Sequence, residues 1–204
     1  MARPEISLVV PVMNEGLIIE ELVKRSMAAI TLVSQEVEMI FVDDGSSDDT
    51  LARIKGHAQA DGRIRYISLS RNFGHQLAIT AGMDHARGNT VVIMDGDLQD
   101  PPELIPELYA KYNEGVHVVY AKRRVRHNEV WWNKWAASIF YRVLRSITRI
   151  DIPLDTGDFR LISRKVLDGL ANMRERDRFL RGQIGLVGLP TGLRAVRSRR
   201  SCGR

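Results

Sequence analysis

Five short apolar runs alternate with helical stretches over the first 121 residues, and this alternation constrains the fold more than any other feature. The runs are Ile6 to Val12, Val37 to Val42, Ile64 to Leu69, Val91 to Met94 and Val116 to Ala121. Strands that are apolar along their whole length, with helices between them, are typical of a mainly parallel sheet covered on both faces. The sequence therefore predicts an α/β domain.

Helix signals lie between these runs. The expected helices are Leu17 to Leu32, Asp48 to Gln59, His75 to Ala86 and Pro102 to Tyr112. We expect Ser46 or Ser47 to cap the second helix, because a hydroxyl oxygen can accept a hydrogen bond from a free N–H of the first turn. Proline near the first turn and Gly115 beyond the last one delimit the fourth helix.

Two of the apolar runs end in acidic turns. The run at 91–94 delivers Asp95 and Asp97 onto the turn that follows, and the run at 37–42 leads into Asp43 and Asp44. Parallel strands open their carboxyl ends toward one edge of the sheet, so both turns are expected to face one crevice. Carboxylate oxygens there would suit a divalent cation that also holds a diphosphate.

Length and cysteine usage bound the organisation of the chain. At 204 residues and 44% hydrophobic, it can bury one substantial core, and we expect one domain. A single cysteine, Cys202, excludes an internal disulfide framework and fits a reducing compartment such as the cytoplasm. We expect no signal peptide and no run of about 18 apolar residues that could span a bilayer.

Charge is unevenly distributed along the chain. Residues 1–120 carry 10 Lys and Arg against 18 Asp and Glu, whereas residues 121–149 carry 8 against 1 and residues 174–204 carry 9 against 2. The basic part should meet an anionic partner. No recognised nucleic-acid module accompanies the charge, so a phosphorylated lipid or an anionic membrane surface is the better fit. The sequence leaves a homo-oligomer open.

Residues 128–147 read as one long helix that contains all three tryptophans, Trp131, Trp132 and Trp135. Its apolar stripe fits either packing on the protein's own core or lying in a membrane interface, where indole is favoured. Residues 188–204 have no apolar periodicity and are rich in arginine, so we expect a basic and poorly ordered tail.

Five segments in this order resemble those of the inverting glycosyltransferases of the GT-A fold, family 2. Among these they are most similar to the polyprenyl-phosphate sugar transferases, such as dolichol-phosphate mannose synthase. The segments are residues 9–15, 42–50, 70–74, 94–102 and 155–161. The resemblance implies a GT-A domain over residues 1–187. It also implies transfer of a sugar, with inversion, from a UDP- or GDP-sugar donor to a polyprenyl phosphate at the cytoplasmic face of a membrane, by a peripherally bound protein.

The resemblance also implies roles for individual residues. Those expected at the nucleotide sugar are Pro11, Met13, Glu15, Val42, Asp44, Arg71, Asp95 and Gly96. Mg²⁺ or Mn²⁺ is expected on Asp95, Asp97 and Gln99. The acceptor phosphate is expected on Arg123, Arg124, Arg126 and Arg160, although the cluster from Lys122 to Arg126 also fits a solvated face.

Catalytic roles are expected for Asp97 and Asp158. A hydroxyl acceptor needs a base to take its proton, whereas a phosphate monoester is already mostly dianionic at neutral pH. We therefore expect Asp158 to position the acceptor, orient an arginine or stabilise positive charge on the sugar. Asp43, Asp48 and Asp49 are expected to be turn residues.

Several features remain without an assigned role or with alternatives. His75, His85, His117 and His127 show no spacing that converges on a shared site, and no chemistry is assigned to them. Family members often continue into a further strand, a basic loop and hydrophobic helices, which we expect to be missing after residue 188. A family 2 transferase acting on a polysaccharide or glycolipid hydroxyl, or an inactive nucleotide-binding or membrane-recruiting module, are the alternative functions.

Overall fold

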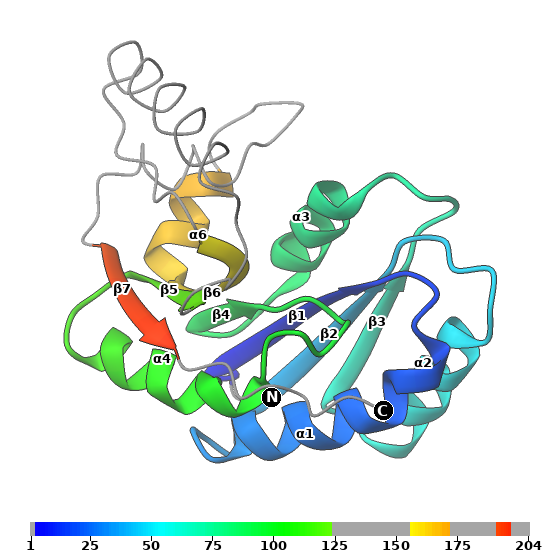
Figure 1. Cartoon of the computed structure of the whole chain (residues 1–204), viewed down its shortest axis with the longest axis horizontal. Coiled ribbons are helices and arrows are strands. Elements are labelled where there is room, and N and C mark those ends of the chain that lie inside the picture. Colours follow the sequence, from blue (N-terminus) through cyan, green and yellow to red (C-terminus); the bar gives the residue numbers. More distant parts are fainter. Residues whose placement is uncertain (1–2, 124–155, 172–190, 197–204) are drawn as a thin grey trace, which may run out of the picture.

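One mixed sheet forms the centre of the molecule. The computed structural model describes residues 3–123, 156–171 and 191–196. Within them, the strand order is β3-β2-β1-β4-β6-β5-β7 (Figure 1). The strands are β1 Ile6–Val12, β2 Val37–Asp43, β3 Ile64–Ser68, β4 Thr90–Ile93, β5 Val118–Arg123, β6 Thr156–Ser163 and β7 Thr191–Val196.

Strand β1 lies between two parallel neighbours. Val9 is opposite Ile40 of β2 on one side and opposite Ile93 of β4 on the other. Strand β3 extends the parallel part beyond β2, whereas β6 runs antiparallel between β4 and β5, and β7 pairs in parallel with β5. The prediction of a mainly parallel sheet is confirmed.

Helices cover both faces of this sheet, as Figure 1 shows. One hydrophobic cluster contains Leu22, Ile54 and Leu108 from the helices on one face, and the other contains Ile79 and Val166 from those on the opposite face. The first set is α1 Ile19–Thr31, α2 Thr50–Ala60 and α4 Ile105–Asn113, with the short 3₁₀ turns η1 Gly16–Ile18 and η2 Pro102–Leu104. The second set is α3 His75–His85 and α6 Arg164–Ala171.

The expected cap of α2 is wrong. The helix begins after Asp49, and the first-turn N–H of Thr50 donates to Asp48 Oδ1 at 3.0 Å. Ser46 and Ser47 instead bond to Asn14 at the end of β1. Because both serines form hydrogen bonds with the loop that follows β1, neither caps the helix.

The chain after residue 155 also differs from expectation. The motif at 155–161 lies largely on β6, and α6 follows it; neither element was predicted as a strand or a helix. Residues 191–196 form β7, so the expectation of a poorly ordered tail without a further strand is wrong for this segment. The helix expected at 128–147 lies outside the described residues, as do Arg124 and Arg126. No helix among the described residues has the length and hydropathy that a membrane span requires.

Helix α3 approaches the sheet closely at Gly82. A Cβ atom at this position would overlap Val9 Cγ1 and lie 3.0 Å from Val42 Cγ2. Glycine therefore allows the helix backbone to contact the centre of the sheet, which places the first turn of α3 beside the carboxyl ends of β1 and β4.

Replacing Gly82 by Ala is expected to lower the free energy of unfolding by about 1–3 kcal/mol, because two core valines would have to move. Gly56→Ala on α2 is the matched control, since a Cβ there meets nothing within 4 Å. The control is expected to be neutral or stabilising by up to about 1 kcal/mol. Urea denaturation of both variants measures the difference, and equal effects would contradict the close approach.

Candidate functional site

A cleft of ≈ 520 Å³ lies at the carboxyl ends of β1, β2 and β4. Eight residues that the sequence predicted for the site line it: Pro11, Met13, Glu15, Asp44, Asp95, Gly96, Asp97 and Asp158. The remaining lining residues come from β1, from the loop before α3 and from the start of α3: Val12, Asn72, Gly74, His75 and Ala78. The two acidic turns therefore do face one crevice.

The loop after β1 is locked to the loop after β2. Asn14 has a φ of 57°, and its Oδ1 accepts a hydrogen bond of 2.8 Å from the N–H of Ser47. Its own N–H donates to Ser46 Oγ at 2.9 Å, and the next N–H, that of Glu15, donates to Thr50 Oγ1 at 2.8 Å. These bonds hold the Glu15 backbone at the rim of the cleft.

Negative charge accumulates at this rim. Burial, and then the negative charges of Asp97 and Asp48, raise the pKa of Glu15 above its ordinary value of 4.5. Carboxylates brought together without cations repel one another. A cation at this point would relieve the repulsion, so the electrostatics of the cleft favour cation binding.

Asp44 positions the loop in front of α3. Its carboxylate is 4% exposed and accepts hydrogen bonds from the N–H groups of Phe73 at 2.8 Å and Gly74 at 3.0 Å. Gly45 has a φ of +76°, and a Cβ there would lie 2.6 Å from the carbonyl carbon of Arg71. Asp44 thus joins the end of β2 to the 70–74 segment. The expected contact of Asp44 with the nucleotide sugar stays a prediction.

The shape of the turn after β4 depends on Gly96 and on Leu98, whose backbone has a left-handed conformation. A Cβ on Gly96 would lie 2.7 Å from Val12 Cγ1 and 3.0 Å from the Pro11 carbonyl oxygen, so this turn packs directly on β1. Leu98 has a φ of 56°, and Asp97 Oδ1 accepts a 3.0 Å bond from the N–H of Gln99. Asp97 is consequently exposed at the mouth of the cleft, while Asp95 lies deeper.

The residues at this turn fit a divalent cation. Asp95 Oδ1 is buried from solvent and, among the described residues, receives no hydrogen bond of good geometry. An oxygen of this kind is costly unless a cation or a donor reaches it. Asp97 lines the same cleft, and carboxylate oxygens are hard ligands of the kind that suit Mg²⁺ or Mn²⁺. The assignment of Asp95, Asp97 and Gln99 as the ligands stays a prediction.

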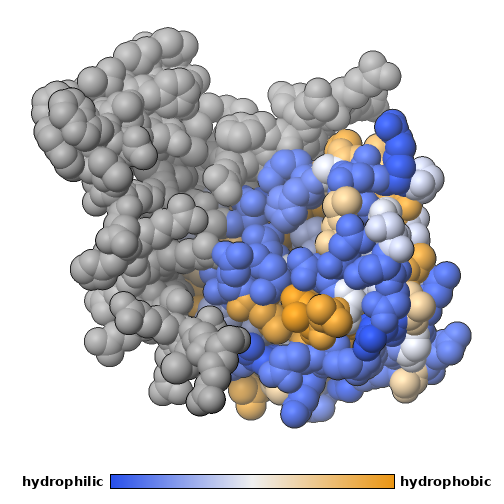
Figure 2. Space-filling view, turned by 45° about the vertical axis from the view of Figure 1, so that its right-hand side comes forward, coloured by the Kyte–Doolittle hydropathy of each residue, from blue (hydrophilic) through white to orange (hydrophobic). Residues whose placement is uncertain are grey.

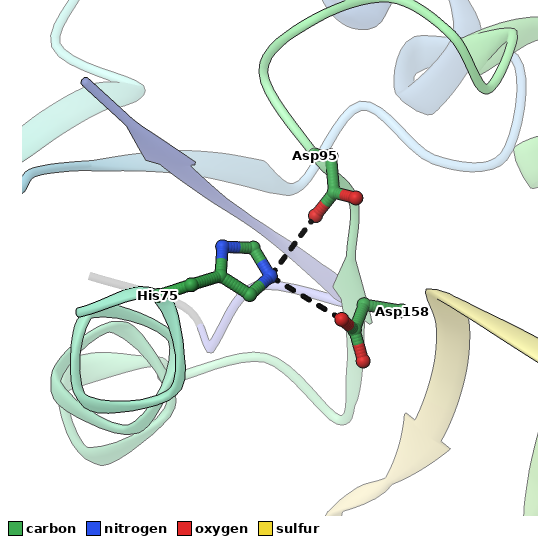
Figure 3. Close-up of side chains that lie close together, drawn as sticks. All are labelled: His75, Asp95 and Asp158. Atoms are coloured by element: carbon green, nitrogen blue, oxygen red, sulfur yellow. Dashed lines mark ion pairs between the residues drawn. The ribbon is translucent and has the colours of Figure 1, made fainter.

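Among the described residues, His75 lies beside two of the acidic side chains of the cleft (Figure 3). It is the first residue of α3, and its Nε2 lies 3.3 Å from Asp95 Oδ1 and 3.3 Å from Asp158 Oδ2. The contact with Asp158, and next that with Asp95, raises the pKa of His75 from 6.5 to about 9. On its other side, Asp158 Oδ1 lies 3.8 Å from Arg160 Nη2.

The expectation that His75 does not converge on a shared site is therefore wrong. His75, Asp95 and Asp158 form a group that converges within 4.8 Å, although they come from α3, the end of β4 and β6. Spacing along the chain could not reveal this, because the three residues are far apart in sequence. The sequence did contain one signal, because His75 directly follows residues 70–74, one of the five segments that resemble the family.

Other expected site residues lie away from the cleft lining. Val42 is buried beneath α3, and Arg160 is buried behind Asp158. Gln99 is exposed just beyond the turn, and the guanidinium of Arg71 lies 4.7 Å above the Phe73 ring on the surface. Arg123 ends β5, and its side chain is not described. The predicted contacts of these residues with donor or acceptor stay predictions.

A sheet covered on both faces, with its acidic cleft at the carboxyl edge, defines an α/β protein of the kind that binds ligands at strand ends. The sequence comparison narrows this class. The chain belongs to the family described as glycosyl transferase family 2, whose model matches residues 7–170.

Relatives in this family cover almost the whole chain. It is 48% identical over 198 residues to YkcC of Bacillus subtilis (strain 168), named an uncharacterized glycosyltransferase, with 97% of this chain and 61% of that protein covered. It is 39% identical over 200 residues to the bactoprenol glucosyl transferase of Shigella phage SfV, with 98% and 65% covered. The chain thus spans less than two thirds of the length of these relatives.

Solved structures share the fold. The mannosyltransferase PcManGT from Pyrobaculum calidifontis, in complex with GDP-Man and Mn²⁺, matches with a TM-score of 0.64 at 20% identity, covering 96% of this chain and 56% of that one. Glucosyl-3-phosphoglycerate synthase from Mycobacterium tuberculosis, in complex with Mn²⁺, UDP and glucosyl-3-phosphoglycerate, matches with a TM-score of 0.58 at 26% identity, covering 83% and 60%. The predicted GT-A fold is confirmed.

We expect His75 to titrate near pH 9 in the metal-free protein, as measured by NMR of its ring Cε1–H in the presence of a chelator. Mg²⁺ should lower this pKa, because the cation adds positive charge and draws Asp95 away. A titration near 6.5, unchanged by Mg²⁺, would show that the two ion pairs do not form in solution.

The same contact predicts a pH-dependent stability. Because folding raises the pKa of His75, its stabilising contribution is fully present below about pH 6.5 and is lost as the pH rises through about 9. The denaturation midpoints of wild-type protein and His75→Gln should therefore differ at pH 6 and converge by pH 10. A difference that grows with pH would contradict this sign.

Proposed function

We propose that the chain carries the catalytic domain of a metal-dependent, inverting glycosyltransferase. It moves one sugar from a UDP- or GDP-sugar to a polyprenyl phosphate at the cytoplasmic face of a membrane. The observation that carries the proposal is the cleft itself, where Asp95 and Asp97 of the family motif meet Glu15, Asp44 and Asp158 from separate elements. Relatives named bactoprenol glucosyl transferases support the lipid acceptor.

Donor binding uses the edge formed by β1, β2 and the turn after β4. Glu15 at the rim can accept hydrogen bonds from the ribose or the base, and Asp44 holds the 70–74 segment that borders the same space. Mg²⁺ or Mn²⁺ on Asp95, Asp97 and Gln99 would neutralise charge that develops on the leaving nucleoside diphosphate. Glu15 and Asp97 raise the negative potential around that position.

Asp158 lies deeper, opposite this turn. A phosphate acceptor with a second pKa near 6 is already a nucleophile at neutral pH and needs no base. Asp158, held between His75 and Arg160, orients the attacking phosphate and stabilises positive charge that develops on the sugar. The lipid acceptor and the basic residues Arg123, Arg124 and Arg126 support a peripheral position at the membrane surface.

Asp97→Asn should weaken Mn²⁺-dependent donor binding by about 100-fold, because loss of even a group that only supports a metal ligand costs about 10–100-fold. Calorimetry with UDP-glucose, UDP-N-acetylglucosamine and GDP-mannose, with and without Mn²⁺, measures the loss and identifies the nucleotide. Asp168→Asn on α6 is the control, since its side chain is 65% exposed and does not line the cleft. Metal-independent binding of the donor by the wild-type protein would refute the metal site.

The acceptor is tested by comparing polyprenyl phosphate with polyprenol of the same chain length. Transfer to the phosphate alone is expected. Replacing Arg123 and Arg126 together by Ala should reduce use of the lipid phosphate at least ~10-fold, as loss of charge-assisted contacts to phosphate implies, and should leave donor binding unchanged. Arg53→Ala on α2, where the side chain pairs with Asp49, is the control. Equal use of polyprenol would favour the alternative of a hydroxyl acceptor.

A further inference from the structure

We propose that His75 is a positioning residue that links cation binding at Asp95 to the orientation of Asp158. In the donor-free protein its Nε2–H is shared between the two carboxylates. When Asp95 turns to the cation, the hydrogen bond goes wholly to Asp158. This inference rests on the proposed function, since it concerns the same cleft.

The first step concerns the number of hydrogen-bond donors at His75. Nε2 of an imidazole carries one hydrogen, yet two carboxylate oxygens lie 3.3 Å from it (Figure 3). Both distances exceed the ~2.7–3.2 Å of a well-formed N–H···O hydrogen bond. Neither carboxylate therefore has a full bond from His75, and a closer approach to one lengthens the contact with the other.

The second step concerns Asp95. Its Oδ1 faces His75 and is also the buried oxygen that a cation at the turn would reach. One oxygen lies between the imidazole and the expected cation, so the two compete for it. Cation binding must weaken the contact between His75 and Asp95.

The third step concerns Asp158. His75 faces Oδ2, whereas Arg160 Nη2 lies 3.8 Å from Oδ1. The side chain is 12% exposed, so few other conformations are open to it. When the Nε2–H of His75 bonds only to Oδ2, His75 holds one oxygen of Asp158 and Arg160 the other. The two contacts together fix the orientation of the carboxylate in the cleft.

The position of His75 is itself rigid. Gly74, which precedes it, has a φ of 99°, and its N–H is bonded to Asp44 at the end of β2. One turn further, the N–H of Ala78 donates to the Gly74 carbonyl oxygen. Gly82 lets the backbone of α3 lie directly on the sheet. An imidazole on such an anchored helix end holds its partners to a defined geometry.

The test compares wild-type protein with His75→Ala, His75→Gln and His85→Ala. The last is the matched control, because His85 lies at the other end of α3. Among the contacts described, its imidazole bonds only to the carbonyl of Ala81 in its own helix, at 2.8 Å. Free Mn²⁺ is titrated by electron paramagnetic resonance without donor or acceptor. Sugar transfer from the donor to polyprenyl phosphate then gives kcat and the donor KM.

His75→Ala is expected to bind Mn²⁺ about two- to five-fold more tightly, as the loss of a competing, partly exposed ion pair implies. Its kcat should nevertheless fall by about 10–100-fold, the effect of removing a group that orients a functional side chain, with a donor KM within about three-fold of wild type. His75→Gln keeps an N–H donor near the place of Nε2 and should recover part of kcat. Replacement of a residue with a merely structural role would not raise the affinity for Mn²⁺ and lower kcat at the same time.

Weaker Mn²⁺ binding by His75→Ala would make His75 a metal ligand and overturn the proposal, and unchanged binding would remove the competition on which it depends. An unchanged kcat would remove the link to Asp158. If the wild-type protein binds Mn²⁺ but transfers no sugar to polyprenyl phosphate, the proposed function fails. The metal titration still decides the competition for Asp95 in that case, so the two failures are distinguishable.

Discussion

The parallel pairing of β1 with both β2 and β4 is the interaction on which the rest of the structure depends. All seven residues of β1 are buried, and the strand is hydrogen-bonded along both edges. Its partners therefore end at the same side of the sheet. Past the last ladder pairs, the Asp44 N–H still bonds to the Val12 carbonyl oxygen and the Met94 N–H to that of Val9. The two acidic turns are placed by backbone pairing before any side chain of the cleft contributes.

This arrangement concentrates negative charge in a small space. Glu15, Asp95, Asp97 and Asp158 line one cleft, and burial, followed by the negative charges of Asp97 and Asp48, raises the pKa of Glu15. Such a group of carboxylates is unfavourable on its own and is maintained by the stable sheet beneath it. Within the described part of the cleft lining, His75 is the basic side chain that offsets this charge. The cleft is thus built to receive further positive charge.

The strands β1 to β5 and the first four long helices could be predicted because each is a continuous apolar or amphipathic segment with clear boundaries. Eight of the expected site residues also line the cleft, and seven of them belong to motifs at the carboxyl ends of β1, β2 and β4. The eighth, Asp158, lies on β6 and was expected from the family resemblance alone. Strand β7 was missed because Thr191–Val196 contains no continuous apolar run and lies in a basic segment. The role of His75 was missed for another reason. Its meeting with Asp95 and Asp158 depends on how α3 lies over the sheet, which Gly82 permits and no local pattern encodes.

The left-handed conformation of Leu98 has a consequence for ligand association. A residue with a side chain adopts this conformation at a cost of about 1–2 kcal/mol, and the packing of Leu98 against the hydrophobic core that includes α4 offsets that cost. The turn that carries Asp95 and Asp97 is consequently shaped by the protein's interior and not by what binds to it. An incoming donor meets a turn that is already ordered, so little of its binding free energy is consumed in restricting the backbone.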